Sequence, residues 1–220
     1  MDYDFTVLPQ FLPYFLPAAW MTLQVTALGI LLGLALGLAT AFLRISDKAV
    51  LNLPARGYIY VIRGTPLLLQ LLFLYYGLRG TLGLSALTSA MLALGVHNGA
   101  YIGEIFRGAI GSIAPGQMEA ARSLGMTSPR AMLRIILPQA FKRAVPALGN
   151  QFIIALKDSS LASAITINEL LLKSQQLASS NFRMMEMLTI AALFYLIYTG
   201  VFTWLFSRVE RRLSLSEGTT

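Results

Sequence analysis

Residues 18–43 read AAWMTLQVTALGILLGLALGLATAFL and carry no charged side chain. About 20 apolar residues let a helix cross the ~30 Å hydrocarbon core of a bilayer, so this stretch predicts a transmembrane helix with some tilt. No basic residue precedes the stretch, and it is longer than the roughly 7–15 apolar residues of a secretory signal. A cleaved signal peptide is therefore not expected.

The composition of the whole chain agrees with a membrane protein. Of the 220 residues, 56% are hydrophobic and 12% are charged, whereas soluble domains carry roughly 25% charged residues. Such hydrophobicity also excludes intrinsic disorder. Four more apolar stretches follow the first. We therefore predict an all-α fold with a single transmembrane domain over 1–220, whose five spans lie at about 18–43, 58–78, 84–106, 144–167 and 187–206.

The basic residues lie mainly on one side of these spans. Thirteen lie in or beside the segments that follow spans one, three and five, and three lie in the segments that follow spans two and four. The positive-inside rule then places the N-terminus outside and the C-terminus in the cytoplasm. The net charge of +7 is thus an orientation signal and does not indicate a nucleic-acid partner. The longest cytoplasmic connection, 107–143, is the place where a soluble partner should dock.

The fourth span is interrupted by Lys157 and Asp158, and Ser159 extends this polar stretch. A charge near the centre of a lipid-facing helix costs several kcal/mol, so at least one of the two charged groups should face protein, water or a substrate. Two interpretations stay open from these residues. The pair lines a translocation pathway, or it forms a structural ion pair that locks neighbouring helices.

The third span carries Asn98 and Tyr101 on one face, and Glu104 nearer the cytoplasm. Glu104 and Arg107 are three residues apart and can pair on a helix, which favours an interfacial salt bridge. His97 is the only histidine, and a lone histidine is weak evidence for a metal, so we expect it to serve packing or the pathway.

Small residues recur every four positions in the first span, at Gly29, Gly33, Gly37 and Ala41. On a helix they form one stripe, along which a second helix can approach closely in lipid. The stripe indicates either an interface between subunits or packing within the chain, and the second is favoured.

Motifs of catalysis are absent from the sequence. It has no GxxxxGK[ST] loop, no HExxH, no GxSxG and no cysteine. We therefore expect no enzyme activity, no metal site and no cofactor on this chain.

The segment 116–138 predicts a helix, a turn at Gly125 and a second helix. Ser128 followed by Pro129 is a favourable helix start, and Pro138 is expected to end that helix. A helix–turn–helix at the membrane surface would be a rigid element that fits a groove on a soluble partner.

This segment resembles the EAA motif of ABC importer permeases. The matching positions are Glu119, Ala120, Ala121, Gly125, Ile135, Leu137 and Pro138. Four other stretches resemble the polar amino acid permeases of the histidine, glutamine, arginine and glutamate type, namely 63–70, 100–108, 116–117 and 157–161. The resemblance covers about residues 22–212.

The resemblance implies a type I ABC importer fold and a multi-protein complex in a bacterial inner membrane. Two permease subunits, identical or homologous, would each rest on one cytoplasmic ATPase subunit, and an extracytoplasmic binding protein would deliver the amino acid. ATP and Mg would be bound by the ATPase. The segment 116–138 would be the coupling helix that transmits ATP-driven movement to the pathway.

The resemblance also suggests two groups of functional residues. Coupling would depend on Glu119, Ala120, Ala121 and Gly125. The pathway would be lined by Asn98, Tyr101, Glu104, Lys157, Asp158 and Ser159, and the last charged pair has the signs that a zwitterion needs.

Two other functions compete with an importer subunit. One is a channel or solute carrier that needs no ATPase. The other is a membrane enzyme or assembly factor that uses Lys157, Asp158 and His97 as acid–base groups. Only the importer accounts for the motif in 116–138. The transported amino acid and the choice between a homodimer and a heterodimer stay open.

Overall fold

The computed structural model describes residues 3–214, and all of its regular structure is helical, which confirms the all-α prediction. The α-helices are α1 (Leu8–Ile45), α2 (Ala49–Arg63), α3 (Leu67–Leu72), α4 (Leu78–Leu82), α5 (Ala86–Gly111), α6 (Pro115–Ser123), α7 (Ser128–Ala131), α8 (Leu137–Asp158), α9 (Leu170–Asn181) and α10 (Met184–Ser214). Between them lie 3-10 turns at Phe5–Val7 and Ser159–Ile165, and π-helical turns at Phe73–Gly77 and Met132–Ile136.

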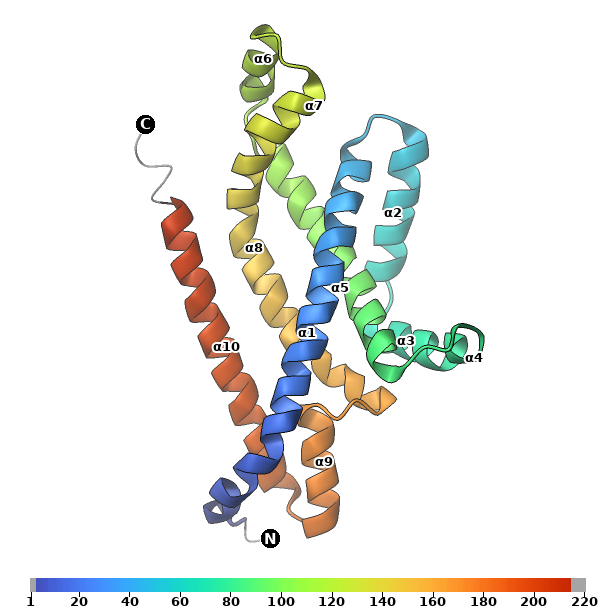
Figure 1. Ribbon diagram of the computed structural model, residues 1–220, viewed down its shortest axis with the longest axis vertical. Helices are drawn as coiled ribbons and strands as arrows, with labels where there is room; N and C mark the ends of the chain where they lie inside the picture. The colour runs from blue at the N-terminus through green and yellow to red at the C-terminus, as the bar shows by residue number, and fades with distance from the viewer. Residues whose placement is uncertain (1–2, 215–220) are drawn as a thin grey trace.

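The long helices α1, α5, α8 and α10 run along the long axis of the molecule (Figure 1). The start of α1 and the short helix α9 lie at one end. The helices α6 and α7 lie at the other end, toward which α10 also runs. The predicted cytoplasmic loop is therefore separated from the predicted outer side by the length of the helices.

The stripe of small residues in 29–41 packs against α5 within the same chain. A Cβ added at Gly29 would lie 2.7 Å from Leu94 Cβ, and one at Gly37 would lie 2.5 Å from Ile102 Cγ2. Real side chains do not approach so closely, so only glycine permits this helix separation. Of the two interpretations of the stripe, packing within the chain is the one that the structure supports.

Helix α5 carries a matching stripe that the sequence analysis missed. A Cβ at Gly95 would lie 2.5 Å from Leu32 Cδ2, and one at Gly99 would lie 2.9 Å from Leu36 Cβ. Gly103 continues the stripe one turn further. Glycines at four-residue spacing on both helices thus bring the two backbones together, and van der Waals contact over this length holds α1 on α5.

The predicted second span, 58–78, is not one continuous helix. It is divided between α2, which ends at Arg63, and the segment that begins at Leu67, and the two are bent by 103°. Pro66 explains the break, because a proline disfavours the helical conformation of the residue before it, here Thr65.

Gln70 stabilises this break. Its Nε2 donates to the backbone oxygens of Ile62 at 2.9 Å and Thr65 at 3.1 Å. The side chain thereby replaces helical hydrogen bonds that the break removes. Its Oε1 lies 3.2 Å from Nδ1 of His97, which connects the break to α5.

Pro138 does not end the second loop helix, contrary to the sequence prediction. The chain continues from Ser128 through the π-helical turn Met132–Ile136 into α8. The wider turn accommodates a ring that would clash with the preceding turn of a regular helix. Gln139 Nε2 donates to Ile135 O at 2.8 Å and so satisfies one carbonyl at this point.

Helix α8 ends at Asp158 and is followed by a 3-10 turn, so the predicted span 144–167 is likewise not a single α-helix.

Two helices in the described part are long and apolar enough to cross a membrane, Phe5–Ile45 and Met184–Leu213. The bent pair formed by α2 and the segment after it would make a third span. Helices α5 and α8 contain more polar side chains, and they pack against α1 and against each other. The count of five spans stays a prediction.

A buried carboxyl group stabilises the end of the molecule at which α1 begins (Figure 1). Glu169 is fully buried and accepts hydrogen bonds from the backbone N–H groups of Leu171 at 2.9 Å and Leu172 at 2.8 Å, which caps α9. It also accepts from the Tyr195 hydroxyl of α10 at 2.9 Å. Thr22 Oγ1 of α1 accepts from the N–H of Leu170 at 3.3 Å. Helix α9 is thus held to α1 and α10 by polar groups that the sequence analysis did not single out.

The glycine contact predicts the effect of one added methyl group. Gly37→Ala should lower the free energy of unfolding by about 1–3 kcal/mol, the usual cost of overpacking, as measured by SDS titration of the purified chain. Gly200→Ala is the control, because Gly200 lies in α10 with no heavy atom within 4 Å of its Cβ position. Equal stability of the two variants would contradict the proposed packing.

Candidate functional site

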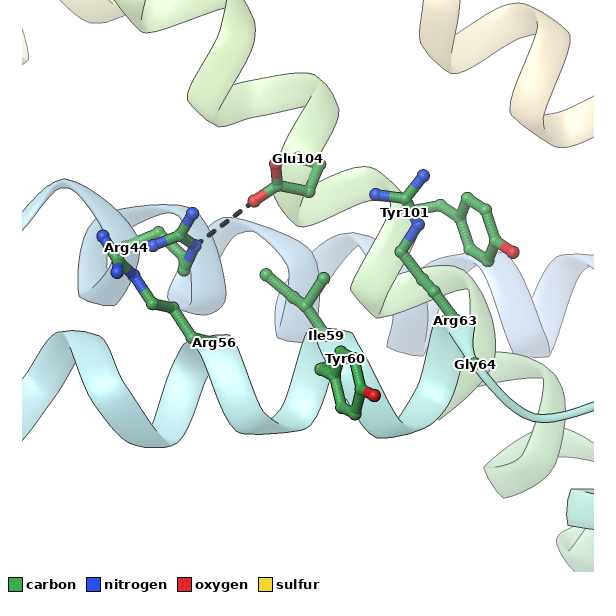
Figure 2. A pocket seen from close by; sticks show the side chains of 8 residues that line it. All are labelled: Arg44, Arg56, Ile59, Tyr60, Arg63, Gly64, Tyr101 and Glu104. Atoms are coloured by element: carbon green, nitrogen blue, oxygen red, sulfur yellow. Dashed lines mark hydrogen bonds and ion pairs between the residues drawn. The ribbon is translucent and has the colours of Figure 1, made fainter.

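A pocket of about 470 Å³ lies between α2, α5 and the end of α1 (Figure 2). Its lining residues are Arg44, Arg56, Ile59, Tyr60, Arg63, Gly64, Tyr101 and Glu104. It therefore includes Tyr101 and Glu104, two residues that the sequence analysis assigned to the pathway.

Glu104 is already paired with two arginines. Arg107 Nη2 lies 2.8 Å from Glu104 Oε2, which confirms the predicted pair at three-residue spacing. Arg44 Nε of α1 lies 3.3 Å from Glu104 Oε1, and Arg44 Nη1 also donates to Asn52 Oδ1 at 2.8 Å. The Arg44 contact was not predicted, because the two residues are far apart in the chain. The Glu104 carboxylate thus connects α1 to α5 rather than standing free in the pocket.

The opposite side of the pocket is formed by stacked side chains. The Arg63 guanidinium lies 4.8 Å from the centre of the Tyr101 ring, close enough for a cation–π interaction. The Tyr101 ring in turn lies 5.1 Å from the ring of His97. Because His97 contacts Gln70, the break after α2 positions this wall of the pocket.

The charge of the pocket is positive. Three arginines line it, and its single carboxylate is shared with Arg107 outside the lining. Within residues 3–214, Arg56 and Arg63 form no ion pair. A carboxylate would be favoured here over an ammonium group.

Asn98 and Ser159 are buried and hydrogen-bonded. Asn98 Nδ2 donates to Leu94 O at 2.8 Å, and its Oδ1 accepts from Gln151 Nε2 at 2.8 Å. The Ser159 hydroxyl donates to Leu156 O at 2.7 Å. Asn98 therefore connects α5 to α8. The spacing of residues along a single helix could not predict this contact.

Lys157 and Asp158 lie at the end of α8. Lys157 is exposed and Asp158 is half-buried. Among the described residues, neither side chain takes part in an ion pair or a hydrogen bond. Within residues 3–214, the structure therefore shows no ion pair of Lys157 or Asp158 that would lock neighbouring helices.

The loop between α6 and α7 is built on a Schellman turn. The N–H of Met126 donates to Ala121 O at 3.1 Å, and that of Gly125 donates to Arg122 O at 3.0 Å. Gly125 has a φ of +81°, a conformation that side chains with a Cβ disfavour. The predicted turn at Gly125 is confirmed, and the role of this glycine is conformational.

The two alanines of the motif face different environments. Ala120 and Glu119 are exposed, whereas Ala121 is buried with 5% of its surface accessible, so it packs inside the loop. Leu124 is 85% exposed at the end of α6. The loop therefore presents Glu119, Ala120 and Leu124 on its surface.

Arg143 closes the base of this loop. Its Nη1 donates to the backbone oxygen of Ser112 at 2.5 Å and lies 3.2 Å from the Ser112 hydroxyl. Ser112 follows α5, and Arg143 lies in α8. The loop is consequently attached to both helices and is not a free appendage.

Long apolar helices, a helix–turn–helix at one end and a positively charged pocket fit a membrane transport subunit. Residues 29–215 match the family described as binding-protein-dependent transport system inner membrane component, and the chain belongs to this family. It is a permease subunit of the amino acid ABC importer type.

Known relatives and structures support this assignment. The chain is 39% identical over 177 residues to the glutamine transport system permease protein GlnP of Escherichia coli K12, covering 79% of this chain and 81% of the relative. It is 40% identical over 172 residues to the nopaline transport system permease protein NocM of Agrobacterium fabrum, covering 73% and 71%. A crystal structure of an amino acid ABC transporter with histidines is similar with a TM-score of 0.89 at 41% identity, covering 96% of this chain and 100% of that chain. The MetNI methionine transporter, at 22% identity and a TM-score of 0.82, shares the fold.

The hydrogen bond between Asn98 and Gln151 predicts coupled stability effects. Asn98→Ala and Gln151→Ala should each destabilise the chain, because each leaves a buried partner unsatisfied. The double variant should lose less than the sum, with a coupling energy of about 0.5–2 kcal/mol in SDS unfolding. Strictly additive losses would mean that the two side chains do not interact.

Proposed function

We propose that this chain is the membrane subunit of an importer that moves a polar amino acid into the cytoplasm at the expense of ATP hydrolysed by a separate subunit. The observation that carries the proposal is the loop 115–131, which closes on a Schellman turn and presents Glu119, Ala120 and Leu124 outward. Such a surface suits a groove on a soluble ATPase. Membership of a binding-protein-dependent transport family supports the same function.

The attachment of the loop supports a mechanical role. The chain runs without interruption through α7, a π-helical turn and α8, from Ser128 to Asp158. At ~1.5 Å per residue this helix is about 46 Å long. Together with the contact of Arg143 to Ser112, it would pass a displacement of the loop to the whole bundle. Rigid-body movement of this kind is a common form of switching.

The amino acid would meet two sets of groups. The positive pocket with Arg56, Arg63 and Tyr101 suits a carboxylate. Asp158 is the better acceptor for an ammonium group, because Glu104 is occupied by two arginines. Lys157 is exposed and free to contact substrate or the second permease.

Asn98, Ser159 and Glu104 would act on the pathway by positioning its helices. The hydrogen bond of Asn98 and the ion pair of Glu104 are directed to neighbouring helices, whereas the Ser159 hydroxyl donates locally to Leu156 O at the end of α8. This arrangement would hold the binding groups in place while the subunits move.

The complete complex would contain two permease subunits, two ATPase subunits and an extracytoplasmic amino-acid-binding protein. ATP and Mg would be bound by the ATPase alone. The permease would lie in a bacterial inner membrane, with the loop 115–131 in the cytoplasm. The family match favours this function over a channel or carrier that needs no ATPase.

The proposed coupling of the loop to the ATPase is tested by substitutions of Gly125, whose left-handed conformation forms the turn. In proteoliposomes with the partner ATPase and binding protein, Gly125→Val should reduce amino-acid-stimulated ATP hydrolysis by about tenfold or more, because valine strains the left-handed turn. Gly125→Asn is the matched control and should retain most activity, since asparagine adopts this conformation more readily. Full stimulation with Gly125→Val, or amino acid flux from the purified chain without any ATPase, would contradict the proposal.

Substrate contact is tested at Asp158. Asp158→Asn should lower amino acid uptake by about tenfold, the effect of roughly 1.4 kcal/mol of lost interaction, while the complex still assembles. Asp47→Asn serves as the control, since Asp47 is an exposed carboxylate outside the helices. If uptake by the Asp158 variant equals that of the Asp47 variant, Asp158 does not bind the substrate.

A further inference from the structure

The single histidine of the chain contacts a side-chain amide whose orientation is fixed. Gln70 Nε2 lies 2.9 Å from Ile62 O, 3.1 Å from Thr65 O and 2.8 Å from Thr65 Oγ1. Carbonyl oxygens only accept hydrogen bonds, so the NH₂ side of the amide must face them. The amide oxygen of Gln70 therefore faces His97 Nδ1, at 3.2 Å.

This contact decides which nitrogen of His97 can take up a proton. An amide oxygen is an acceptor only, so Nδ1 must carry a hydrogen and donate it to Gln70. In the neutral ring, the lone pair then lies on Nε2, which makes no hydrogen bond among the described residues. The ring is half-buried, so Nε2 can exchange a proton with water. Protonation leaves the bond to Gln70 in place, because Nδ1 donates in both charge states.

Tyr101 places a permanent cation close to this ring. Figure 2 shows the Arg63 guanidinium beside Tyr101, and it lies 4.8 Å from the centre of the Tyr101 ring. The same ring lies 5.1 Å from the ring of His97, so Arg63 and His97 are at most about 10 Å apart. At an effective dielectric constant of ~20, two like charges at this distance change an equilibrium by about tenfold. Arg63 therefore opposes a positive charge on His97.

The nearest acid on α5 does not offset this repulsion. Glu104 lies two helical turns from His97, and its carboxylate is shared between Arg44 and Arg107. Helix α1 carries no charged side chain between 18 and 43, and α3 carries none. These two helices pack directly against α5.

The other elements packed against α5 contribute titratable groups of two kinds. The tyrosines of α2 and of the π-helical turn titrate near pH 10, far from the range of histidine; they are Tyr58, Tyr60, Tyr75 and Tyr76. The charged side chains are Arg56 of α2 and, at the two ends of α8, Lys142, Arg143, Lys157 and Asp158. Arg63 is thus the charge that contacts the aromatic neighbour of His97.

We propose that His97 is a proton-binding site linked to the amino acid site: the substrate carboxylate neutralises Arg63, and Nε2 of His97 then takes up one proton from water. This inference rests on the proposed importer function, in which the pocket with Arg63 receives the carboxylate. Linkage is reciprocal, so protonated His97 in turn holds the carboxylate more tightly. The proton enters with the amino acid and returns to water on its release, and no bond of the amino acid changes.

The binding test follows the sign of this linkage. Uptake of a proton on binding makes the affinity rise as the pH falls through the range of histidine, near pH 6.5. A ¹⁴C-labelled amino acid mixture without histidine and cysteine should bind the permease–ATPase complex about five- to tenfold more tightly at about pH 5.5 than at about pH 7.5. His97→Asn should remove the difference, since its amide still donates to Gln70 but does not titrate.

Magnetic resonance observes the proton directly, because the permease contains one histidine. The sample is a complex of ¹⁵N-histidine-labelled permease, with a histidine-free tag, and unlabelled ATPase. The ring signals should show Nδ1 protonated and Nε2 titrating, and the amino acid mixture should move the titration midpoint upward by about one pH unit.

Arg63→Gln should move this midpoint upward without any amino acid, because the opposing charge is gone. Arg56→Gln is the matched control and should move it less. Arg56 lies about 10 Å further along α2, at the other end of the same pocket (Figure 2).

Three results would overturn the inference while the importer function stands. They are an equal midpoint with and without bound amino acid, an unchanged midpoint in Arg63→Gln, and a neutral ring protonated at Nε2. The resonance experiment uses the wild-type chain, so it decides even if His97→Asn fails to assemble. A complex that binds none of the labelled amino acids at either pH, and whose ATP hydrolysis none of them stimulates, would refute the proposed function and this inference together.

Discussion

The close contact of α1 with α5 is the constraint on which the other features depend. Glycines on both helices, such as Gly33 and Gly99, remove the side chains that would separate the backbones. In lipid there is no hydrophobic gain from bringing two apolar helices together, so van der Waals contact at short distance must hold them. With α5 fixed on α1, Glu104 reaches Arg44, and Asn98 is placed to meet Gln151 on α8. The pocket, the hydrogen bond between Asn98 and Gln151, and the attachment of the loop through Arg143 and Ser112 thus all depend on the packing of α1 against α5.

The sequence predicted much of this arrangement, because several signals are local. Apolar length predicted the membrane helices, the glycine spacing predicted a packed stripe, and the pattern around Gly125 predicted the turn. The pairing of Glu104 with Arg107 followed from three-residue spacing on a helix. The motif in 116–138 predicted the family, which the comparisons confirmed.

Other features depend on contacts between distant residues and could not be predicted in this way. The broken second span depends on Gln70, which caps carbonyls on the far side of Pro66. The continuation past Pro138 depends on a π-helical turn that residue counting does not indicate. Asn98 was predicted to line a pathway because its polarity is visible in sequence, whereas its partner Gln151 lies 53 residues away. The left-handed conformation and the exposure of Phe182 were not predicted, since no simple sequence pattern encodes either of them.

We propose that one permease chain moves as a rigid body, so that ATP-driven displacement of its loop would change the arrangement of the two permeases. Because the chain contains no cysteine, labels can be placed uniquely at Arg130→Cys in α7 and Ala39→Cys in α1. Electron–electron distance measurements with one labelled chain per complex should give the same intrachain distance with and without ATP. The distance between the Arg130→Cys sites of the two permease subunits should change. A changed intrachain distance at an unchanged intersubunit distance would mean that the loop moves alone, and would contradict the account.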